Sequence, residues 1–242
     1  MDIKEIKQTG KTAFRANYWR CVVVAVLLGI LTAGTSAAAG SSAPVPGTDV
    51  TTQEQEVTDA FNSLTPDQQV LFVTFIFGTL SVILVISMLL KIFLSNPLQV
   101  GGFRFFRKNL TDPSTGISVV GEGFGNYGHT FLTLLLRDLF LALWTALFVI
   151  PGIVKSYSYR LVPYLIKDDP ELSAAETITL SRQLMNGHKM EAFIMDLSFI
   201  GWYLLGTITL NLVNIFWTQP YHQSAQAAFY LRLKEGTADF SE

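Results

Sequence analysis

The stretch "LFVIPGIVKSYSYRLVPYLI" (147–166) decides the fold, because two rules for membrane proteins lead to opposite expectations for the side of the membrane on which it lies. The apolar run that ends at Ile150 has the length and composition of a membrane span that carries the chain to the outer face. Lys155 and Arg160 follow at once, yet basic residues gather on the cytoplasmic side of a membrane. Either the number of spans differs from this simple count, or the rule fails here.

A return helix removes the conflict. A tight turn at Pro151-Gly152 followed by a helix over Ile153–Ile166 brings the basic residues back to the inner side. Such a helix is about 21 Å long at 1.5 Å per residue, which is shorter than the roughly 30 Å hydrocarbon core. We therefore expect it to be short, tilted and packed against protein neighbours.

The composition supports a membrane protein. Half of the 242 residues are hydrophobic, only 15% are charged, and the mean hydropathy is +0.37. A soluble domain carries about 25% charged residues. Cys21 is the one cysteine of the chain, so an internal disulfide and a cysteine-based metal site are excluded.

The N-terminal segment has an amphipathic pattern. Lys4, Lys7, Lys11 and Arg15 lie largely opposite a face with Ile3, Ile6, Ala13 and Phe14. This pattern predicts a helix that lies on the anionic inner leaflet. A cleaved signal peptide is the alternative, since "GTSAAAGSSA" (34–43) offers small residues, but the long basic region favours retention.

The chain as a whole is predicted to be an all-α, polytopic membrane bundle. Residues 40–69 contain no Lys or Arg and form a predicted outer loop. A capping box is expected at Thr65 with Gln68, and a second at Ser173 with Glu176, where a polar inner-surface helix of about 13 residues begins. The expected spans and returns are Trp19–Ala39, Val70–Leu94, Thr130–Ile150, Ile153–Ile166, Ala192–Phe216 and 221–234.

These six membrane helices form three predicted hairpins, with amphipathic helices on the inner surface and both termini in the cytoplasm. One integral membrane domain spans 1–242, with hairpin 1 at 1–110, hairpin 2 at 117–167 and hairpin 3 at 173–235. Residues 126–144 resemble 186–202, which predicts an internal repeat of the parallel type. Chance likeness between apolar helices is the alternative.

Four segments carry a resemblance to a known family. They are "NPLQVGGFRFF" (96–106), "IPGIVKSYSY" (150–159), "LSAAETITLSRQLMNGHK" (172–189) and "DLSFIGWYLL" (196–205). In this order they resemble the bacterial integral-membrane family catalogued as domain of unknown function nine-seven-five, over nearly the whole chain. The resemblance implies a multi-pass protein of a bacterial plasma membrane and assigns no reaction, cofactor or catalytic residue.

Charged and polar residues inside the predicted spans are the candidate site. Charge within a membrane is costly, and it marks function or close pairing. Helical neighbours point about 100° apart, so Arg137 and Asp138 are not expected to face each other. Two readings remain open: a polar cluster open to the cytoplasm that binds a charged or amphipathic ligand or passes protons, or clasps between helices. The candidate residues are Arg137, Asp138, Asp196, Tyr157, Arg160, His222 and Gln226.

Familiar catalytic motifs are missing from the sequence. "GFGNYG" (123–128) matches a dinucleotide fingerprint in spacing only, since no strand is expected before it, and its glycines predict a flexible hinge. The chain has no Walker A loop, nucleophile elbow or zinc-protease motif. We expect no enzyme activity, no catalytic residue, no cofactor, no metal site and no nucleic-acid partner.

Aromatic residues are expected at the membrane boundaries, with Phe105 and Phe106 inside and Trp217 and Tyr221 outside. The lipid bilayer is then the main partner, with a membrane protein as a possible second. The sequence favours a protein that handles or transports a small or amphipathic ligand through a polar intramembrane cavity. The alternative is a non-catalytic partner or scaffold that stabilises or regulates another membrane complex.

Overall fold

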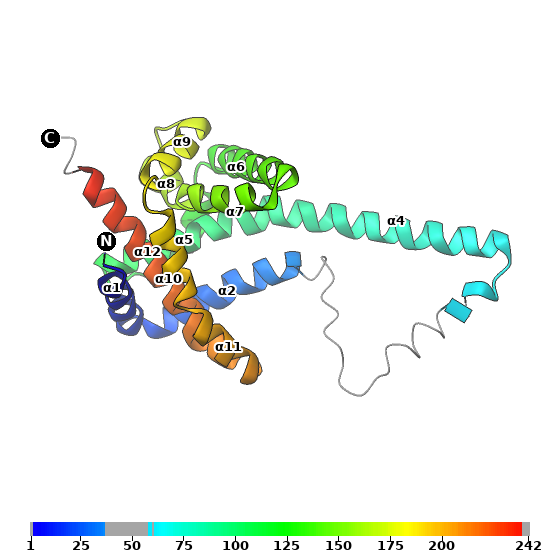
Figure 1. Ribbon diagram of the computed structural model, residues 1–242, viewed down its shortest axis with the longest axis horizontal. Helices are drawn as coiled ribbons and strands as arrows, with labels where there is room; N and C mark the ends of the chain where they lie inside the picture. The colour runs from blue at the N-terminus through cyan, green and yellow to red at the C-terminus, as the bar shows by residue number, and fades with distance from the viewer. Residues whose placement is uncertain (1, 37–57, 60, 239–242) are drawn as a thin grey trace. The chain divides into compact units, whose positions relative to one another are not determined.

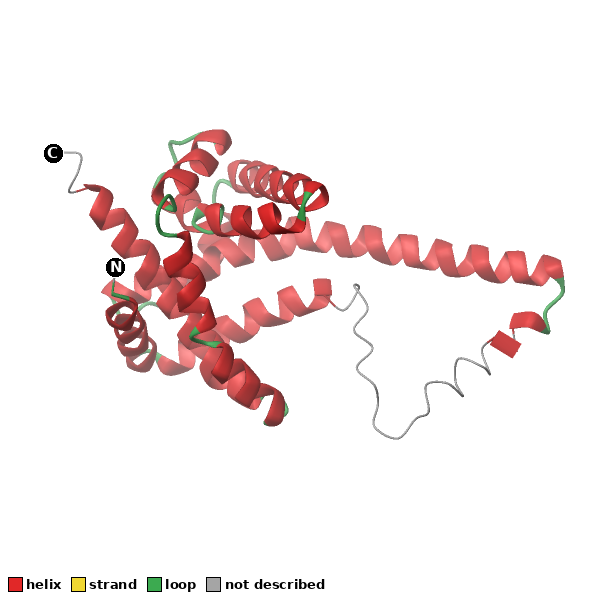
Figure 2. Cartoon of the chain, in the orientation of Figure 1, coloured by secondary structure: helices red, strands yellow, loops and turns green. Residues whose placement is uncertain are grey.

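The computed structural model describes residues 2–36, 58–59 and 61–238, and the regular structure of these residues is helical (Figures 1 and 2). Residues 37–57 of the predicted outer loop lie outside the described residues. The chain divides into two units, one formed by residues 1–30 with 92–242 and one by residues 31–91. The helices are α1 (Ile3–Ala16), α2 (Tyr18–Ser36), α4 (Pro66–Leu90), η2 (Lys91–Ser95), α5 (Asn96–Thr111), η3 (Ile117–Phe124), α6 (Tyr127–Leu147), α7 (Val149–Ser158), α8 (Val162–Asp168), α9 (Ala174–Leu184), α10 (Lys189–Leu197), α11 (Ile200–Ile208), η4 (Asn214–Thr218) and α12 (Gln219–Ala238).

Helix α4, of the second unit, is a long apolar helix. The backbone N–H of Thr65 donates to Gln68 Oε1 at 3.0 Å, and Pro66 is the first helical residue. Proline suits this position because its missing N–H has no helical partner there. The 25 residues of α4 span about 38 Å, and its apolar side chains are exposed along the whole helix. The helix overlaps the predicted second span, and its length and composition suit a membrane crossing.

Three helical segments among the described residues are long and apolar enough to cross a membrane. They are Pro66–Ser87, Tyr127–Leu147 and Lys189–Ile208, and Tyr18–Gly29 is a shorter apolar helix. They coincide with three of the expected spans. Of the predicted return helices, the one at 153–166 is divided between the short helices α7 and α8, and the one at 221–234 belongs to α12, whose residues Ala225, Phe229 and Tyr230 are buried. The scheme of six crossings stays a prediction.

The turn between α6 and α7 differs from the predicted one. The chain reverses at Phe148, which has extended backbone (φ −154°, ψ 133°), and α7 starts at Val149. Pro151 and Gly152 therefore lie inside the first turn of α7, where proline breaks no hydrogen bond. The predicted continuous helix over 153–166 is also wrong, because Tyr159–Leu161 separate α7 from α8.

Gly152 allows α6 and α7 to approach closely. A Cβ on Gly152 would lie 2.6 Å from Thr145 Oγ1 and 2.8 Å from Thr145 Cα. We expect Gly152→Ala to lower the free energy of unfolding by about 1–3 kcal/mol, the usual cost of overpacking. Gly128→Ala is the control, because a Cβ at Gly128 meets open space. Thermal unfolding midpoints in detergent check this, and equal midpoints for the two variants would contradict it.

The protein core is built around α12. Ala225, Phe229 and Tyr230 of this helix are buried. Helix α1 packs on it so closely that a Cβ on Gly10 would lie 2.7 Å from Ala225 Cα. The apolar face of α1 is thus covered by protein, with Phe14 fully buried. The amphipathic pattern of α1 is confirmed, but the expectation that this apolar face rests on lipid is wrong.

Several aromatic residues that were expected at the membrane boundary lie in this core instead. Phe105 and Phe106 are buried, and their rings are 5.4 Å apart. Tyr221 packs against Phe199 at 4.9 Å. These residues join α5, α10–α11 and α12 into one apolar cluster.

Two prolines are accommodated by one local arrangement. Pro97 and Pro220 each follow a short π-helix, η2 or η4. Because proline has no N–H, the carbonyl four residues earlier loses its helical partner. Tyr127 Oη donates to the Phe93 carbonyl at 3.4 Å, and Tyr18 Oη donates to the Phe216 carbonyl at 3.1 Å.

The outward helix of the third hairpin ends before Phe216, the end expected from the sequence. The outward helix ends at Ile208, and the chain reverses at Leu210 and Asn211, both of positive φ (49° and 68°). Pro220 lies after the turn, at the start of α12. The polar segment after Pro220 is wrapped by α1 and α5, because two of its small residues, Ser224 and Ala225, are buried.

Of the glycines in the predicted hinge at 123–128, Gly123 belongs to a closely packed element. Residues 117–124 form the 3-10 helix η3 against α5. A Cβ on Gly123 would overlap the Pro97 carbonyl, and one on Gly101 would overlap the Val120 carbonyl. The two backbones thus touch directly.

Helix α9 confirms the second predicted capping box. Ser173 Oγ accepts from the Glu176 backbone N–H, and Glu176 Oε2 accepts from the Ser173 N–H at 2.8 Å. The helix has 11 residues, and Gly187 beyond its end has a positive φ of 83°. One face of α9 is buried through Ile178 and Leu184.

Candidate functional site

Asp196 of α10 is the centre of a polar cluster, the Asp196 cluster, formed with Tyr157, Arg160, Tyr203, His222 and Gln226. Arg160 lies in the short segment between α7 and α8. Its Nη1 and Nη2 each donate to one Asp196 oxygen at 2.7 Å. This two-point geometry is the strongest form of the arginine–carboxylate pair.

Other elements add donors to the same carboxylate. Tyr157 Oη of α7 donates to Asp196 Oδ2 at 3.1 Å. His222 Nε2 of α12 lies 2.8 Å from Asp196 Oδ1. With that nitrogen as donor, His222 Nδ1 accepts from Tyr203 Oη at 3.1 Å. Gln226 Nε2 lies 3.2 Å from His222 Nε2.

The structure therefore brings together five of the seven candidate residues from the sequence. The cluster is largely withdrawn from solvent: the exposed fraction of the side chain is 16% for Arg160, 26% for Asp196 and 14% for His222. The donors of α7, the α7–α8 segment and α12 are directed at a carboxylate of α10, so the cluster joins these elements. This is the clasp between helices that the sequence left as one of two readings. A ligand-binding role of these residues stays a prediction.

Arg137 and Asp138 form a separate pair. Arg137 Nη2 and Nε donate to Asp138 Oδ1 at 2.7 Å and 2.9 Å, so the expectation that these neighbours do not face each other is wrong. Long side chains can bend toward each other even when their Cα–Cβ bonds diverge. Within the described residues, no hydrogen bond or ion pair links Arg137 or Asp138 to Asp196.

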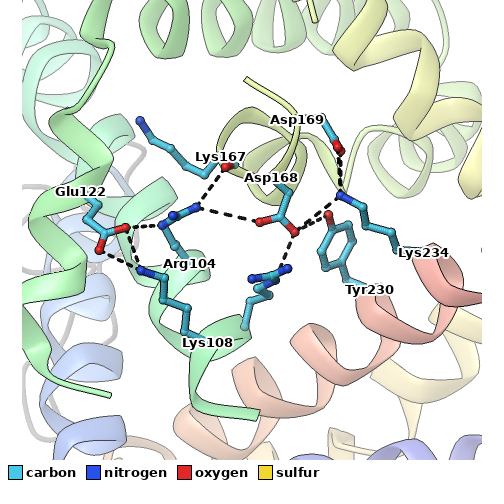
Figure 3. Close-up of polar contacts among 9 residues, drawn as sticks. Arg104, Lys108, Glu122, Lys167, Asp168, Asp169, Tyr230 and Lys234 are labelled. Carbon is cyan, nitrogen blue, oxygen red and sulfur yellow. Dashed lines mark hydrogen bonds and ion pairs between the residues drawn. The ribbon is translucent and has the colours of Figure 1, made fainter. Parts of the chain in front are cut away.

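A second ionic cluster, the Asp168 cluster, was not predicted (Figure 3). The Asp168 side chain is only 4% exposed. It accepts a hydrogen bond from Tyr230 Oη at 2.8 Å and pairs with Arg107 Nε at 3.1 Å. Arg104 and Lys234 lie near the same carboxylate, and Lys234 also pairs with Asp169 at 2.9 Å.

The Asp168 cluster joins α5, α8 and α12, as the sticks of Figure 3 show. The sequence contains only a weak pattern from which the Asp168 cluster could have been predicted. The cations of "FRFFRK" (103–108) stand three and four residues apart, so they share one helical face. The acidic pair Asp168-Asp169 follows the predicted return helix, yet no rule of spacing connects two segments so far apart in the chain.

Glu122 extends this network toward η3. It pairs with Arg104 and with Lys108, whose Nζ donates to Glu122 Oε1 at 2.9 Å. Partial burial raises the pKa of Glu122, but the hydrogen bonds and positive charges of Lys108 and Arg104 outweigh it and hold the pKa below the ordinary value of 4.5. Glu122 is therefore more acidic in the folded chain than in the unfolded one.

This shift predicts a pH dependence. A depressed carboxyl pKa stabilises the fold at pH values above 4.5, and the stabilisation is lost as the pH falls below that value. We expect the unfolding midpoint to drop less between pH 7 and pH 4 in Glu122→Gln than in the parent protein. Glu171→Gln, at an exposed position, is the control and should follow the parent. An unchanged drop in Glu122→Gln would contradict the assignment.

A basic hollow lies along α1. It has a volume of about 430 Å³. Four cations of one helical face line it, Lys4, Lys7, Lys11 and Arg15, together with Gln8, Thr12 and Tyr221. Lys7 Nζ donates to Ser198 Oγ at 2.9 Å and lies 4.6 Å from the Phe199 ring centre. Burial and the nearby charge of Lys11 lower the pKa of Lys7.

Lys4 and Lys11 have no ion-pair partner among the residues that the structure describes, so the hollow is positively charged. Arg15 is held by a cation–π contact of 5.7 Å with Trp217. In the described ranges, no group of three His, Cys, Asp or Glu residues could hold a metal ion.

Comparison with known proteins finds a matching family for part of the chain. Residues 147–237 match the family described as "Protein of unknown function (DUF975)". This confirms the resemblance for α7 to α12, while the match is narrower than the nearly full-length likeness inferred from the sequence. No curated protein and no solved structure matches the chain.

Proposed function

We propose that this protein, whose residues 147–237 match the DUF975 family of unknown function, binds an anionic amphipathic molecule at the inner leaflet of a bacterial plasma membrane. The basic hollow along α1 is the observation that carries the proposal. The protein acts as a binder rather than an enzyme, with no catalytic residue and no cofactor.

The hollow suits a phosphate or carboxylate head group. Four cations line about 430 Å³, and each cation close to an anionic membrane surface contributes about 1 kcal/mol. Lysine ammonium groups are compact point charges on flexible chains, which accept an anion without one fixed geometry. The neutral partners Gln8 and Thr12 add hydrogen-bonding groups at the same wall.

The surroundings of the hollow suit the apolar part of such a molecule. Tyr221 forms one edge of the hollow. On the nearby hairpin, Leu204, Leu212 and Phe216 are exposed. An acyl chain lying along this hairpin would cover apolar surface while its head group stays at the cations.

The proposal includes the orientation predicted from the sequence. Both termini lie in the cytoplasm, because the cations of α1, α5, α9 and α12 then share the inner side. The chain forms one integral membrane domain with its hairpins in 1–110, 117–167 and 173–235. Transport of the bound molecule through the Asp196 cluster is not part of the proposal, since that cluster is occupied by its own side chains.

The test compares two lipids that differ in head-group charge. Short-chain phosphatidylglycerol should raise the unfolding midpoint of the purified protein in neutral detergent, because a ligand of the folded state stabilises it. Short-chain phosphatidylcholine should not. In Lys4→Gln/Lys11→Gln, apparent affinity for phosphatidylglycerol should fall at least tenfold, which corresponds to about 1.4 kcal/mol.

The control variant removes two cations elsewhere. Arg182→Gln/Lys189→Gln has the same change in net charge and does not touch the hollow. It should retain the parent affinity. An equal loss in both double variants, or equal stabilisation by the two lipids, would overturn the proposed site.

A scaffold role is the second candidate, and α4 is the observation that favours it. Its apolar side chains are exposed along the whole helix, which suits lipid or a partner helix. A photo-crosslinking residue at Phe77 in native membranes separates these outcomes. A discrete protein adduct supports the scaffold role, and adducts with lipid alone contradict it.

A further inference from the structure

We infer that the α6–α7 and α11–η4 hairpins enter the bilayer from the cytoplasmic side and end near its midplane, with acyl chains of one leaflet as their partner. This inference is independent of the proposed ligand. It replaces the six crossings expected from the sequence by two, made by α4 and the helix before the outer loop.

The first argument is the length of the α6–α7 hairpin beyond its last charges in α6. Arg137 and Asp138 pair with each other within α6. From there to the turn at Phe148 the helix has about ten residues without charge, or about 15 Å. That is half of the roughly 30 Å hydrocarbon core.

The α11–η4 hairpin has the same reach. Lys7 of α1 donates to Ser198 at the base of this hairpin, so a charged group marks that level. Helix α11 beyond it has nine residues, which span about 14 Å. The chain then turns back at Leu210. The two hairpins thus extend about the same distance beyond a charged level.

The composition of the two tips is the second argument. A loop at the outer membrane surface would carry polar residues. The α6–α7 tip consists of Leu147, Phe148, Val149 and Ile150, and Ile150 is 76% exposed. In the other tip, Leu210 is 88% exposed. Such surfaces are unfavourable in water and favourable among acyl chains.

The hydrogen bonds of the α11–η4 turn are the third argument. Inside hydrocarbon, backbone polar groups need internal partners. The Asn211 backbone N–H donates to the Gly206 carbonyl at 2.8 Å, and the Leu212 N–H donates to the Thr209 carbonyl at 3.0 Å. Asn214 Nδ2 donates to Asn211 Oδ1 at 2.7 Å, which joins these two side chains within the hairpin, whereas Asn214 Oδ1 is buried and has no hydrogen-bond partner among the described residues.

The position of Lys155 in α7 is consistent with a hairpin tip near the bilayer midplane. It lies about 9 Å from the start of α7 at Val149, and a lysine can extend its ammonium group to the head-group layer. Its Nζ lies 4.6 Å from the Trp144 ring centre.

The experiment places single cysteines at the tips in a Cys21→Ser background. Phe148→Cys and Leu210→Cys replace exposed side chains, so the fold should be retained. A membrane-impermeant maleimide is applied to right-side-out and to inside-out vesicles, and labelling is compared with that of the same variant in detergent. We expect labelling from each side to be at least tenfold below the detergent value.

A spin label on the same cysteines then measures depth. Collision rates with oxygen should be high and those with a water-soluble nickel chelate low, giving a position near the midplane. Gln183→Cys, exposed on α9, is the control and should be labelled in inside-out vesicles. Labelling of either tip from the outside would show a crossing, and labelling from the inside would show a tip in water. Both results would overturn the inference.

Discussion

Asp196→Leu is expected to lower the free energy of unfolding by on the order of 2 kcal/mol, because Arg160 and His222 then lose their shared acceptor while largely withdrawn from water. Removal of one partner from a fully buried ion pair destabilises a protein by about 3–5 kcal/mol. This is an upper bound here, since the Asp196 side chain is 26% exposed. The midpoint of thermal unfolding in detergent measures the effect.

A double variant separates the pair from its surroundings. Arg160→Leu/Asp196→Leu removes both charges, and replacing both partners by apolar residues is often close to neutral. We expect the double variant to be more stable than Asp196→Leu alone. If the two single substitutions simply add, Arg160 and Asp196 do not stabilise the fold as a pair.

Gly123→Ala is expected to have a larger effect than Gly152→Ala, on the order of 3 kcal/mol or more, because the added methyl group meets backbone that cannot rotate away. A Cβ on Gly123 would overlap the Pro97 carbonyl of α5. The yield of folded protein in detergent, by size-exclusion chromatography, and its unfolding midpoint measure the loss.

Gly121→Ala is the matched control, since it lies in the same 3-10 helix and a Cβ there meets nothing within 4 Å. It should behave as the parent protein. Comparable stability of Gly123→Ala and Gly121→Ala would show that η3 does not pack on α5 as described.

The helical class and several local signals could be read from the sequence. The capping box at Ser173 and the hydrogen bond between Thr65 and Gln68 at the start of α4 follow from local chemistry. The residues around Asp196 could also be listed, because charge and polarity inside apolar runs stand out. These predictions depend on few neighbours along the chain.

The rest depends on contacts between distant segments. Burial of the apolar face of α1 against α12 cannot be told from burial in lipid, since both need the same pattern of apolar residues. The Asp168 cluster joins three helices whose register only the folded chain defines. The position of the turn at Phe148 was missed because proline suits the first turn of a helix as well as a loop.

The orientation of the chain is tested most directly by fusions at its C-terminus. A green fluorescent protein fused after Glu242 should be fluorescent and an alkaline phosphatase at the same place inactive, since α12 and its cations then lie in the cytoplasm. Active phosphatase with dark fluorescent protein would place the cations outside and contradict the account.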